Sequence, residues 1–210
     1  DATKFAGWQL DADKSYLAIV RLGVTTSTGD SEGEVIDRRP VSVSWPQIEA
    51  ILEKFRGSIW QTPPMYSALK LEGKPLYLLA RAGKTVERRP RSISIHELEA
   101  LSLRGDLLEL RIRCSKGTYV RSLAEDMGAA LGTGAHLAAL RRTKAGSLSV
   151  DDATSLEALA QMTEDEREHR LLPLDALLGN VPRMDCGADQ EARLRNGQMI
   201  EIRQQQIGPA

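Results

Sequence analysis

The sequence is poor in aromatic residues and cysteines, and it has almost no net charge. Aromatic side chains make up 4% of the 210 residues, and the formal net charge is −1. The two cysteines, Cys114 and Cys186, are far apart, and the three histidines are isolated from one another. This distribution argues against a disulfide scaffold, gives no metal-ligand spacing and fits a reducing cytoplasm. No apolar run is long enough to cross a membrane.

The small total charge hides a local segregation of charge. Basic residues are frequent between positions 81 and 91 and between positions 111 and 144, whereas acidic residues dominate positions 163–168. A chain with little net charge can still present a basic face to a nucleic acid. Scattered, solvated charges are the alternative interpretation. With 41% hydrophobic and 27% charged residues, the composition is that of a soluble globular protein with a sizeable core.

The spacing of apolar residues predicts both strands and helices. Apolar and charged residues alternate over LLELRIRC, residues 107–114, and less regularly over residues 93–103, with Gly105–Asp106 as a hairpin turn between them. Strands paired in this way, with helices between them, indicate an α+β fold with a mixed, mainly antiparallel sheet and flanking helices. A further strand is predicted over residues 13–23, and helices are predicted between Ser44 and Gly57, over residues 75–82, from about 119 to 132, over 135–142 and after Thr154.

The stretch RCSKGTYVRSLAEDMG, residues 113–128, carries an unusual set of side chains at a strand-to-helix turn. Its first glycine permits a tight turn, and the free N–H groups of the following helix favour an anion beside Lys116. A purely structural junction is the alternative. In that case Thr118 caps the helix, Tyr119 belongs to the core and Arg121 is a surface residue.

Three other segments suit RNA but also have structural alternatives. Tyr16 in DADKSY could stack on a base or lie in the core. The segment GAHLAALRRTKAG, residues 134–146, is expected to end a helix with basic residues that contact phosphates or stabilise the helix end. Aromatic and basic residues are interleaved in PPMYSALK and GKPLYLLARAGKTVERRPR, which suits single-stranded or loop RNA, although a solvated basic loop has the same composition.

Taken in order, these segments resemble the bacterial tRNA pseudouridine synthase family called TruB. The resemblance extends from Ala2 to about Leu177 and is carried by ATKF, LDADKSY, RLGVTTSTGDSEGEV, FRGSIWQTPPMYSALKLEGKPLYLLARAG, RCSKGTYVRSLAEDMG and GTGAHLAALRRTKAGSLSVDDA. It implies isomerisation of a uridine in the T-loop of tRNA to pseudouridine, after the base is flipped into a pocket. It also implies the tRNA T-arm as partner, with no metal, no organic cofactor and no protein partner. We further expect a cytoplasmic monomer.

The resemblance assigns roles to four residues. Tyr16 matches the family's active-site tyrosine, which stacks on the flipped base and helps to remove a proton from the sugar. Arg121 matches the arginine that pairs with the catalytic carboxylate, and Tyr119 and Leu140 match residues of the uridine pocket. Further RNA-binding candidates are Lys4, Asp30, Lys70, Arg81, Arg88, Lys116, Arg141 and Arg142.

The resemblance also predicts two domains. Residues 1–178 match the catalytic domain, in which residues 61–91 form an insertion that closes over the tRNA arm like a thumb and binds phosphates. Residues 179–210 resemble the start of a small β-rich PUA-type RNA-binding domain, with LRNGQ as its signature. The family's catalytic aspartate belongs to a G-T-L-D-P motif that residues 1–210 do not contain. We therefore expect this aspartate, the partner of Arg121, upstream of the chain.

Two other functions stay open at this point. Without that aspartate, these residues could form an RNA-binding or tRNA-folding module that performs no chemistry. The other alternative is a guide-RNA-dependent pseudouridine synthase, although the long insertion favours the stand-alone bacterial type. Tritium release from labelled uridine in tRNA distinguishes an enzyme from a binding module, and activity on a bare transcript tests the need for a guide RNA.

Overall fold

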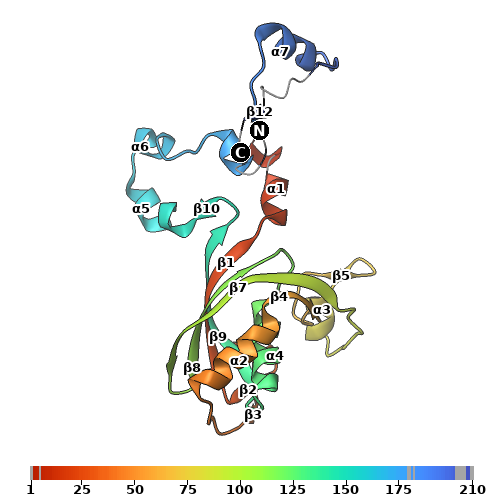
Figure 1. Ribbon diagram of the computed structural model, residues 1–210, viewed down its shortest axis with the longest axis vertical. Helices are drawn as coiled ribbons and strands as arrows, with labels where there is room; N and C mark the ends of the chain where they lie inside the picture. The colour runs from red at the N-terminus through yellow and green to blue at the C-terminus, as the bar shows by residue number, and fades with distance from the viewer. Residues whose placement is uncertain (1, 5, 179–180, 182, 202–206, 209–210) are drawn as a thin grey trace. The chain divides into compact units, whose positions relative to one another are not determined.

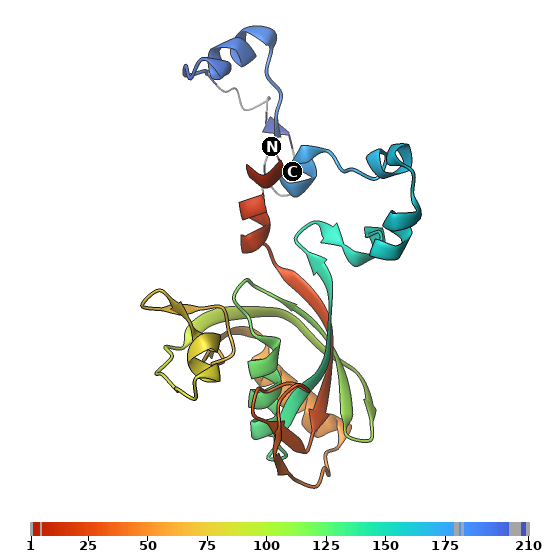
Figure 2. The same ribbon diagram turned by 180° about the vertical axis from the view of Figure 1, so that it is seen from behind.

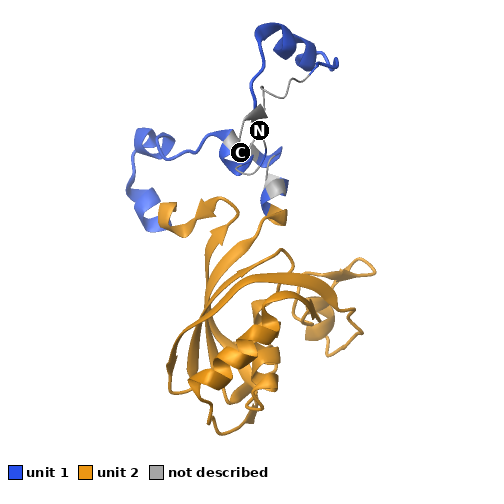
Figure 3. Cartoon of the chain, in the orientation of Figure 1, with its two compact units in different colours: residues 1–9, 155–210 blue, residues 10–154 orange. Residues whose placement is uncertain are grey.

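The computed structural model describes residues 2–4, 6–178, 181, 183–201 and 207–208 (Figure 1). The chain divides into two compact units (Figure 3). One consists of residues 10–154 and contains the sheet. The other consists of residues 1–9 and 155–210. None of the helices in the described ranges combines the length and hydropathy of a membrane-spanning segment.

The centre of the larger unit is a six-stranded sheet with the strand order β10-β9-β1-β8-β7-β4. All neighbouring strands in this sheet are antiparallel, which confirms the predicted α+β fold with a mainly antiparallel sheet. The strands are β1 (Lys14–Leu22), β4 (Gly57–Gln61), β7 (Arg91–Arg104), β8 (Leu107–Cys114), β9 (Ala135–Ala145) and β10 (Leu148–Ser149).

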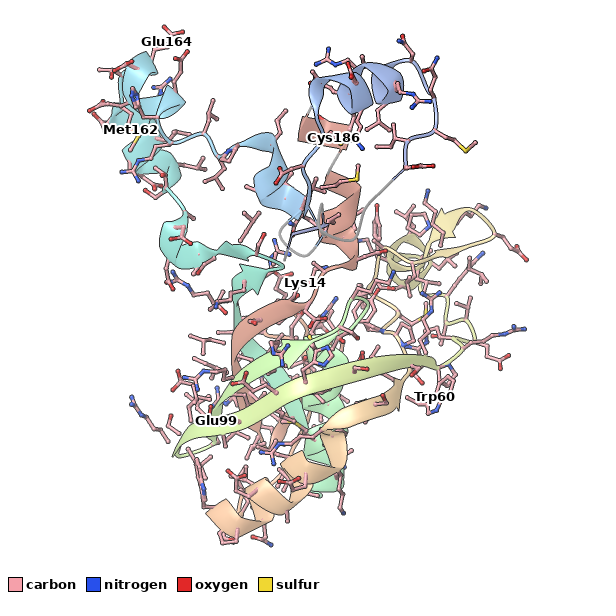
Figure 4. All side chains as sticks on the ribbon, turned by 45° about the horizontal axis from the view of Figure 1, so that its top comes forward. Lys14, Trp60, Glu99, Met162, Glu164 and Cys186 are labelled. Carbon is pink, nitrogen blue, oxygen red and sulfur yellow. The ribbon has the colours of Figure 1, made fainter. Side chains whose placement is uncertain are left out.

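The core lies between this sheet and the helices α2 (Trp45–Phe55) and α4 (Val120–Ala130), which pack against one face of it (Figures 1 and 2). Strand β8 illustrates what holds the helices on this face. Its residues Leu108, Leu110 and Ile112 are fully buried, and burying each such side chain contributes roughly 1.5–3 kcal/mol to stability. The other face is polar. There Glu99 of β7 forms an ion pair with Arg111 of β8 (Figure 4).

Several predicted elements are confirmed, with physical reasons visible in the structure. The hairpin turn lies at Gly105, whose φ of +62° suits glycine, between β7 and β8. Strand β7 contains two register shifts, which explains why its apolar residues alternate imperfectly. Helix α2 begins after Ser44, whose backbone N–H donates to the Gln47 side chain at 2.8 Å.

The predicted helix over residues 135–142 is wrong, because these residues belong to β9. Alanine and leucine favour helices, but β9 pairs with β1 from Ala135 opposite Leu22 to Ala145 opposite Lys14. Pairing along a whole central strand outweighs such local preferences. Arg141 and Arg142 therefore lie on a strand and not at a helix end.

The predicted insertion leaves and rejoins the sheet at one place. Gln61 at the end of β4 pairs with Arg91 at the start of β7. The residues between them include the short strands β5 (Lys70–Leu71) and β6 (Lys74–Pro75), which pair with each other, and the helix α3 (Leu76–Arg81). A second small hairpin pairs β2 (Val24–Thr26) with β3 (Val35–Arg38), and its loop holds residues 27–34.

The smaller unit consists of short elements: η1 (Ala2–Lys4), most of α1 (Ala6–Asp11), α5 (Leu156–Gln161), α6 (Glu164–Glu168), η3 (Leu174–Leu178), β11 (Arg183–Met184), α7 (Ala188–Arg195) and β12 (Ile207–Gly208). Helix α5 is capped by Ser155 and not by Thr154, because the Ser155 hydroxyl accepts from the Ala158 N–H. The PUA-like domain stays a prediction. Its positions 179–180, 182, 202–206 and 209–210 lie outside the described residues.

Candidate active site

One cavity of about 520 Å³ in the larger unit brings together residues that are far apart in the sequence. Its walls come from β1, from the loop between β2 and β3, from the start of α4 and from β9. Four of its lining residues are those to which the sequence analysis assigned catalytic or pocket roles: Tyr16, Tyr119, Arg121 and Leu140. Asp30, predicted as an RNA-binding residue, also lines it.

Tyr16 reaches the cavity from β1, the strand between β8 and β9. It pairs with Ile112 on β8 and with Arg142 on β9. Burial raises the pKa of the Tyr16 hydroxyl, and the nearby Cys114 raises it further, whereas the Arg142 guanidinium offsets part of the rise. The hydroxyl is therefore protonated at neutral pH, and Tyr16 can offer an aromatic ring and a hydrogen-bond donor.

The junction between β8 and α4 positions Tyr119 and Arg121. Gly117 adopts a φ of +78° in the turn, which favours glycine. The Thr118 hydroxyl donates to the Ser115 carbonyl at 3.0 Å and does not cap the helix; the N-cap residue is Tyr119. Since α4 begins at Val120, Arg121 lies in its first turn, and its side chain lines the cavity.

Arg121 is fixed by three acceptors from two loops. Its Nη1 atom donates to Asp30 Oδ2 at 2.9 Å and to the Thr28 carbonyl at 3.3 Å, and its Nη2 atom donates to the Tyr66 carbonyl at 2.6 Å. The Arg121 and Asp30 side chains are each 23% exposed. A planar guanidinium held in this way keeps one orientation, and its charge is only partly screened by water.

The loop that carries Asp30 is attached to β9. The Leu137 N–H donates to the Gly29 carbonyl at 3.0 Å, and Asp30 forms an isolated parallel bridge with Leu137. The Thr28 hydroxyl donates to Asp30 Oδ1 at 2.5 Å. Gly29 has a φ of +75°, and an added Cβ would lie within 3 Å of the Glu125 carboxylate. The loop therefore has little freedom to move Asp30 away from Arg121.

Arg121 has a carboxylate partner within the chain. The sequence analysis placed the carboxylate that pairs with Arg121 outside the chain and assigned Asp30 to RNA binding. In the structure Asp30 forms an ion pair with Arg121. The upstream catalytic carboxylate and an RNA contact of Asp30 both stay predictions. The two residues are 91 positions apart, and only the attachment of the Asp30 loop to β9 brings them together. The sequence contains no local pattern that predicts this pair.

The other predicted RNA-binding residues do not line this cavity within the described part of the chain. Lys4 lies in η1 of the smaller unit. Lys70 lies in β5, and the Arg81 guanidinium is 5.5 Å from the centre of the Tyr77 ring.

The remaining candidates have partners within the protein. Lys116 forms an exposed ion pair with Asp11 at 2.7 Å. Arg141 and Arg142 lie on β9 opposite Leu17 and Tyr16, and Arg88 donates to the Pro63 carbonyl at 3.0 Å.

A second cavity of about 530 Å³ lies between α4 and the insertion. Glu125 and Asp126 line it from α4, and Lys84 and Arg88 line it from the insertion. Burial raises the pKa of both carboxyls; Asp126 raises that of Glu125 further, and Arg121 and Arg88 partly offset it. The sequence analysis missed these two acids, because they look like the ordinary polar face of an amphipathic helix.

The sequence analysis also missed Gln61 and Tyr66, which contact the backbone of Tyr119 and the side chain of Arg121. Both lie at the start of the insertion, and nothing in their sequence surroundings predicts which backbone they contact. Among the described residues, no group of three acidic, histidine or cysteine side chains could hold a metal ion. The first cavity instead combines two aromatic rings, an apolar wall and a fixed cation, which suits a planar heterocycle.

The comparisons with known proteins identify a family. Residues 1–120 match the family "TruB family pseudouridylate synthase (N terminal domain)", and residues 121–179 match "tRNA pseudouridylate synthase B C-terminal domain". The protein named tRNA pseudouridine synthase B from Ralstonia nicotianae is 52% identical over 206 residues, which are 96% of this chain and 66% of that protein. The protein of the same name from Burkholderia mallei is 51% identical over 202 residues, with 96% and 67% covered. The chain thus spans about two thirds of the length of these relatives.

Solved structures share the fold at lower identity. A chain of a Cbf5-Nop10-Gar1 complex superposes with a TM-score of 0.71 at 24% identity, over 93% of this chain and 52% of that one. A chain of an H/ACA RNP bound to a substrate RNA containing 2′-deoxyuridine gives a TM-score of 0.60 at 22% identity, over 87% and 46%. At this identity the likeness concerns the fold.

Proposed function

The chain belongs to the TruB family of pseudouridylate synthases, and from this membership we propose that the complete protein isomerises a uridine in the T-loop of tRNA to pseudouridine. The observation that carries the proposal is the cavity around Arg121, which joins the rings of Tyr16 and Tyr119 to Leu140 and the Asp30 carboxylate. The names of the two relatives, which are 52% and 51% identical, support tRNA as the substrate.

The reaction breaks the bond between ribose C1′ and base N1, turns the base and forms a bond between C1′ and C5. The C5 proton is lost and N1 gains a proton, so atoms and oxidation state balance and no electron acceptor is needed. A uridine in a folded loop must leave its stack first, and a pocket with aromatic walls stabilises the flipped base. Tyr16, Tyr119 and Leu140 supply such walls.

The charged residues would orient the reacting groups. Asp30 and two carbonyls fix Arg121, and a fixed guanidinium keeps a neighbouring catalytic carboxylate ionised and aimed. The raised pKa of the Tyr16 hydroxyl keeps it protonated at neutral pH. Tyr16 would therefore act first as a stacking and hydrogen-bonding group, and it would assist proton removal from the sugar only if it loses its own proton.

The insertion would bind the tRNA arm through phosphates. Lys70, Arg81, Lys84 and Arg88 lie on it, outside the first cavity, and such contacts give an affinity that falls as salt is added. The protein would act as a cytoplasmic monomer on the T-arm without a protein partner. The likeness to a chain of a Cbf5-Nop10-Gar1 complex is at 24% identity and concerns the fold, so it does not argue for a protein partner.

Tritium release from a tRNA transcript labelled at uridine C5 tests the proposal, because C5 loses its proton when it bonds to ribose. We expect the complete protein to release tritium from the bare transcript, and not from a transcript with cytidine at the T-loop position. No release from the bare transcript despite binding would favour the RNA-binding or tRNA-folding module. Release only after a guide RNA is added would favour a guide-dependent enzyme.

A further inference from the structure

Gln61 makes an unusual contact with the backbone of a cavity residue. Its Nε2 atom donates to the Tyr119 carbonyl at 3.1 Å, and its Oε1 atom accepts from the Tyr119 N–H at 2.8 Å. Gln61 as a whole residue is 2% exposed, so water does not compete for these bonds. We propose that Gln61 is a positioning residue for the cavity, acting through Tyr119; this inference rests on the proposed function.

The two bonds hold Tyr119 on both sides of its Cα. Tyr119 is the N-cap residue of α4, and no side chain of its own caps the helix. Its carbonyl also accepts from the Leu123 N–H at 3.1 Å, within the first turn. Because Gln61 fixes both the N–H and the carbonyl of Tyr119, the direction in which the ring leaves the backbone is set by a strand 58 residues away.

The same segment of chain also contacts Arg121. Gln61 is the last residue of β4, and the insertion begins immediately after it. Five residues later, the Tyr66 carbonyl accepts from Arg121 Nη2 at 2.6 Å. The first residues of the insertion thus contact two cavity residues, Tyr119 and Arg121. Lys70 and Arg81 lie farther along the insertion, in β5 and α3. Loss of the Gln61 bonds should therefore change the cavity and leave the cations of the insertion in place.

This placement predicts a separation of binding from chemistry. A misplaced pocket group lowers the rate of the chemical step, and a displacement of about 1 Å can cost roughly 100-fold. Overall tRNA affinity depends mainly on phosphate contacts, which Gln61 does not make. A residue that only stabilises the fold would lower the melting temperature and leave the rate of the folded enzyme unchanged.

The test uses Gln61→Leu and Gln61→Asn in the complete protein. Leucine removes both bonds, and asparagine keeps both polar groups on a shorter side chain, so it serves if the leucine variant does not fold. Gln47→Leu is the matched control: Gln47 accepts from the backbone N–H of another N-cap residue, Ser44, at 2.8 Å, but at the exposed start of α2. Single-turnover tritium release, the Kd for tRNA and hydrogen exchange at the Tyr119 amide are measured below the melting temperature.

We expect faster exchange at Tyr119 and a rate about 10- to 100-fold lower in the Gln61 variants, with the Kd within threefold of the parent value. The Gln47 variant should lose melting temperature but keep its rate within twofold. A folded Gln61 variant with the parent's rate, or with unchanged exchange at Tyr119, overturns the inference. A parent protein that releases no tritium overturns the proposed function itself, and the inference with it.

Discussion

The ion pair between Arg121 and Asp30 gives the most direct test of how the cavity is held together. Asp30→Asn removes the negative charge but keeps the shape of the side chain and an oxygen for the Thr28 hydroxyl. The pair is 2.9 Å long and each side chain is 23% exposed, between a surface pair and a buried one. A hydrogen bond to a charged group contributes about 1.5–3 kcal/mol, and partial solvent screening reduces this to about 1–2 kcal/mol.

Urea unfolding of the complete protein, followed by tryptophan fluorescence, measures this loss. Asp106→Asn is the control, because it breaks an ion pair of the same length between Asp106 and Arg21. The Arg21 side chain is 46% exposed and the Asp106 side chain is 35% exposed. We expect that control to lose less than about 1 kcal/mol. We also expect Asp30→Asn to slow single-turnover tritium release, since Arg121 loses one of its three acceptors. Equal stability and equal rate in Asp30→Asn and the parent would refute the role given to this pair.

Three further predictions concern the Asp30 loop, helix α4 and the insertion. Gly29→Ala should lower the melting temperature and the turnover, because a Cβ at φ +75° meets the Glu125 carboxylate. Glu125→Gln should raise the unfolding free energy near pH 7 and not near pH 4. Burial raises the pKa of Glu125 in the folded protein, so the protonated carboxyl favours folding and this stabilisation is lost as pH rises. Equal unfolding free energies of Glu125→Gln and the parent at both pH values would contradict this. Lys70→Ala should lower the slope of log Kd against log salt by about 1, and an unchanged slope would remove Lys70 from the phosphate contacts.

The contrast between β8 and β9 shows what the sequence can predict of the fold. In β8 every second side chain is buried, so the alternation alone identifies the strand. In β9 the first three residues, from Ala135 to Leu137, are all buried and the following ones are mostly exposed. A strand buried on both faces at one end has no two-residue period, and its alanines and leucines then resemble a helix.

Residues of the cavity could be predicted from the sequence when they belong to a recognisable motif. Tyr16, Tyr119 and Leu140 lie in such motifs, and they line one cavity although they come from three elements. Asp30 and Gln61 were not predictable in their observed contacts. Asp30 meets Arg121 because its loop is attached to β9, and Gln61 meets Tyr119 because β4 ends beside the start of α4. These contacts follow from the tertiary structure and leave no local pattern.

Replacement of Arg121 tests the central claim, that this cavity is where the uridine is isomerised. We expect Arg121→Ala in the complete protein to lower the single-turnover rate by about 100-fold or more, because the fixed charge is lost, while the Kd for tRNA stays within threefold. Arg111→Ala, on the polar face of the sheet, should keep the parent's rate. A folded Arg121→Ala protein that releases tritium as fast as the parent would contradict the account.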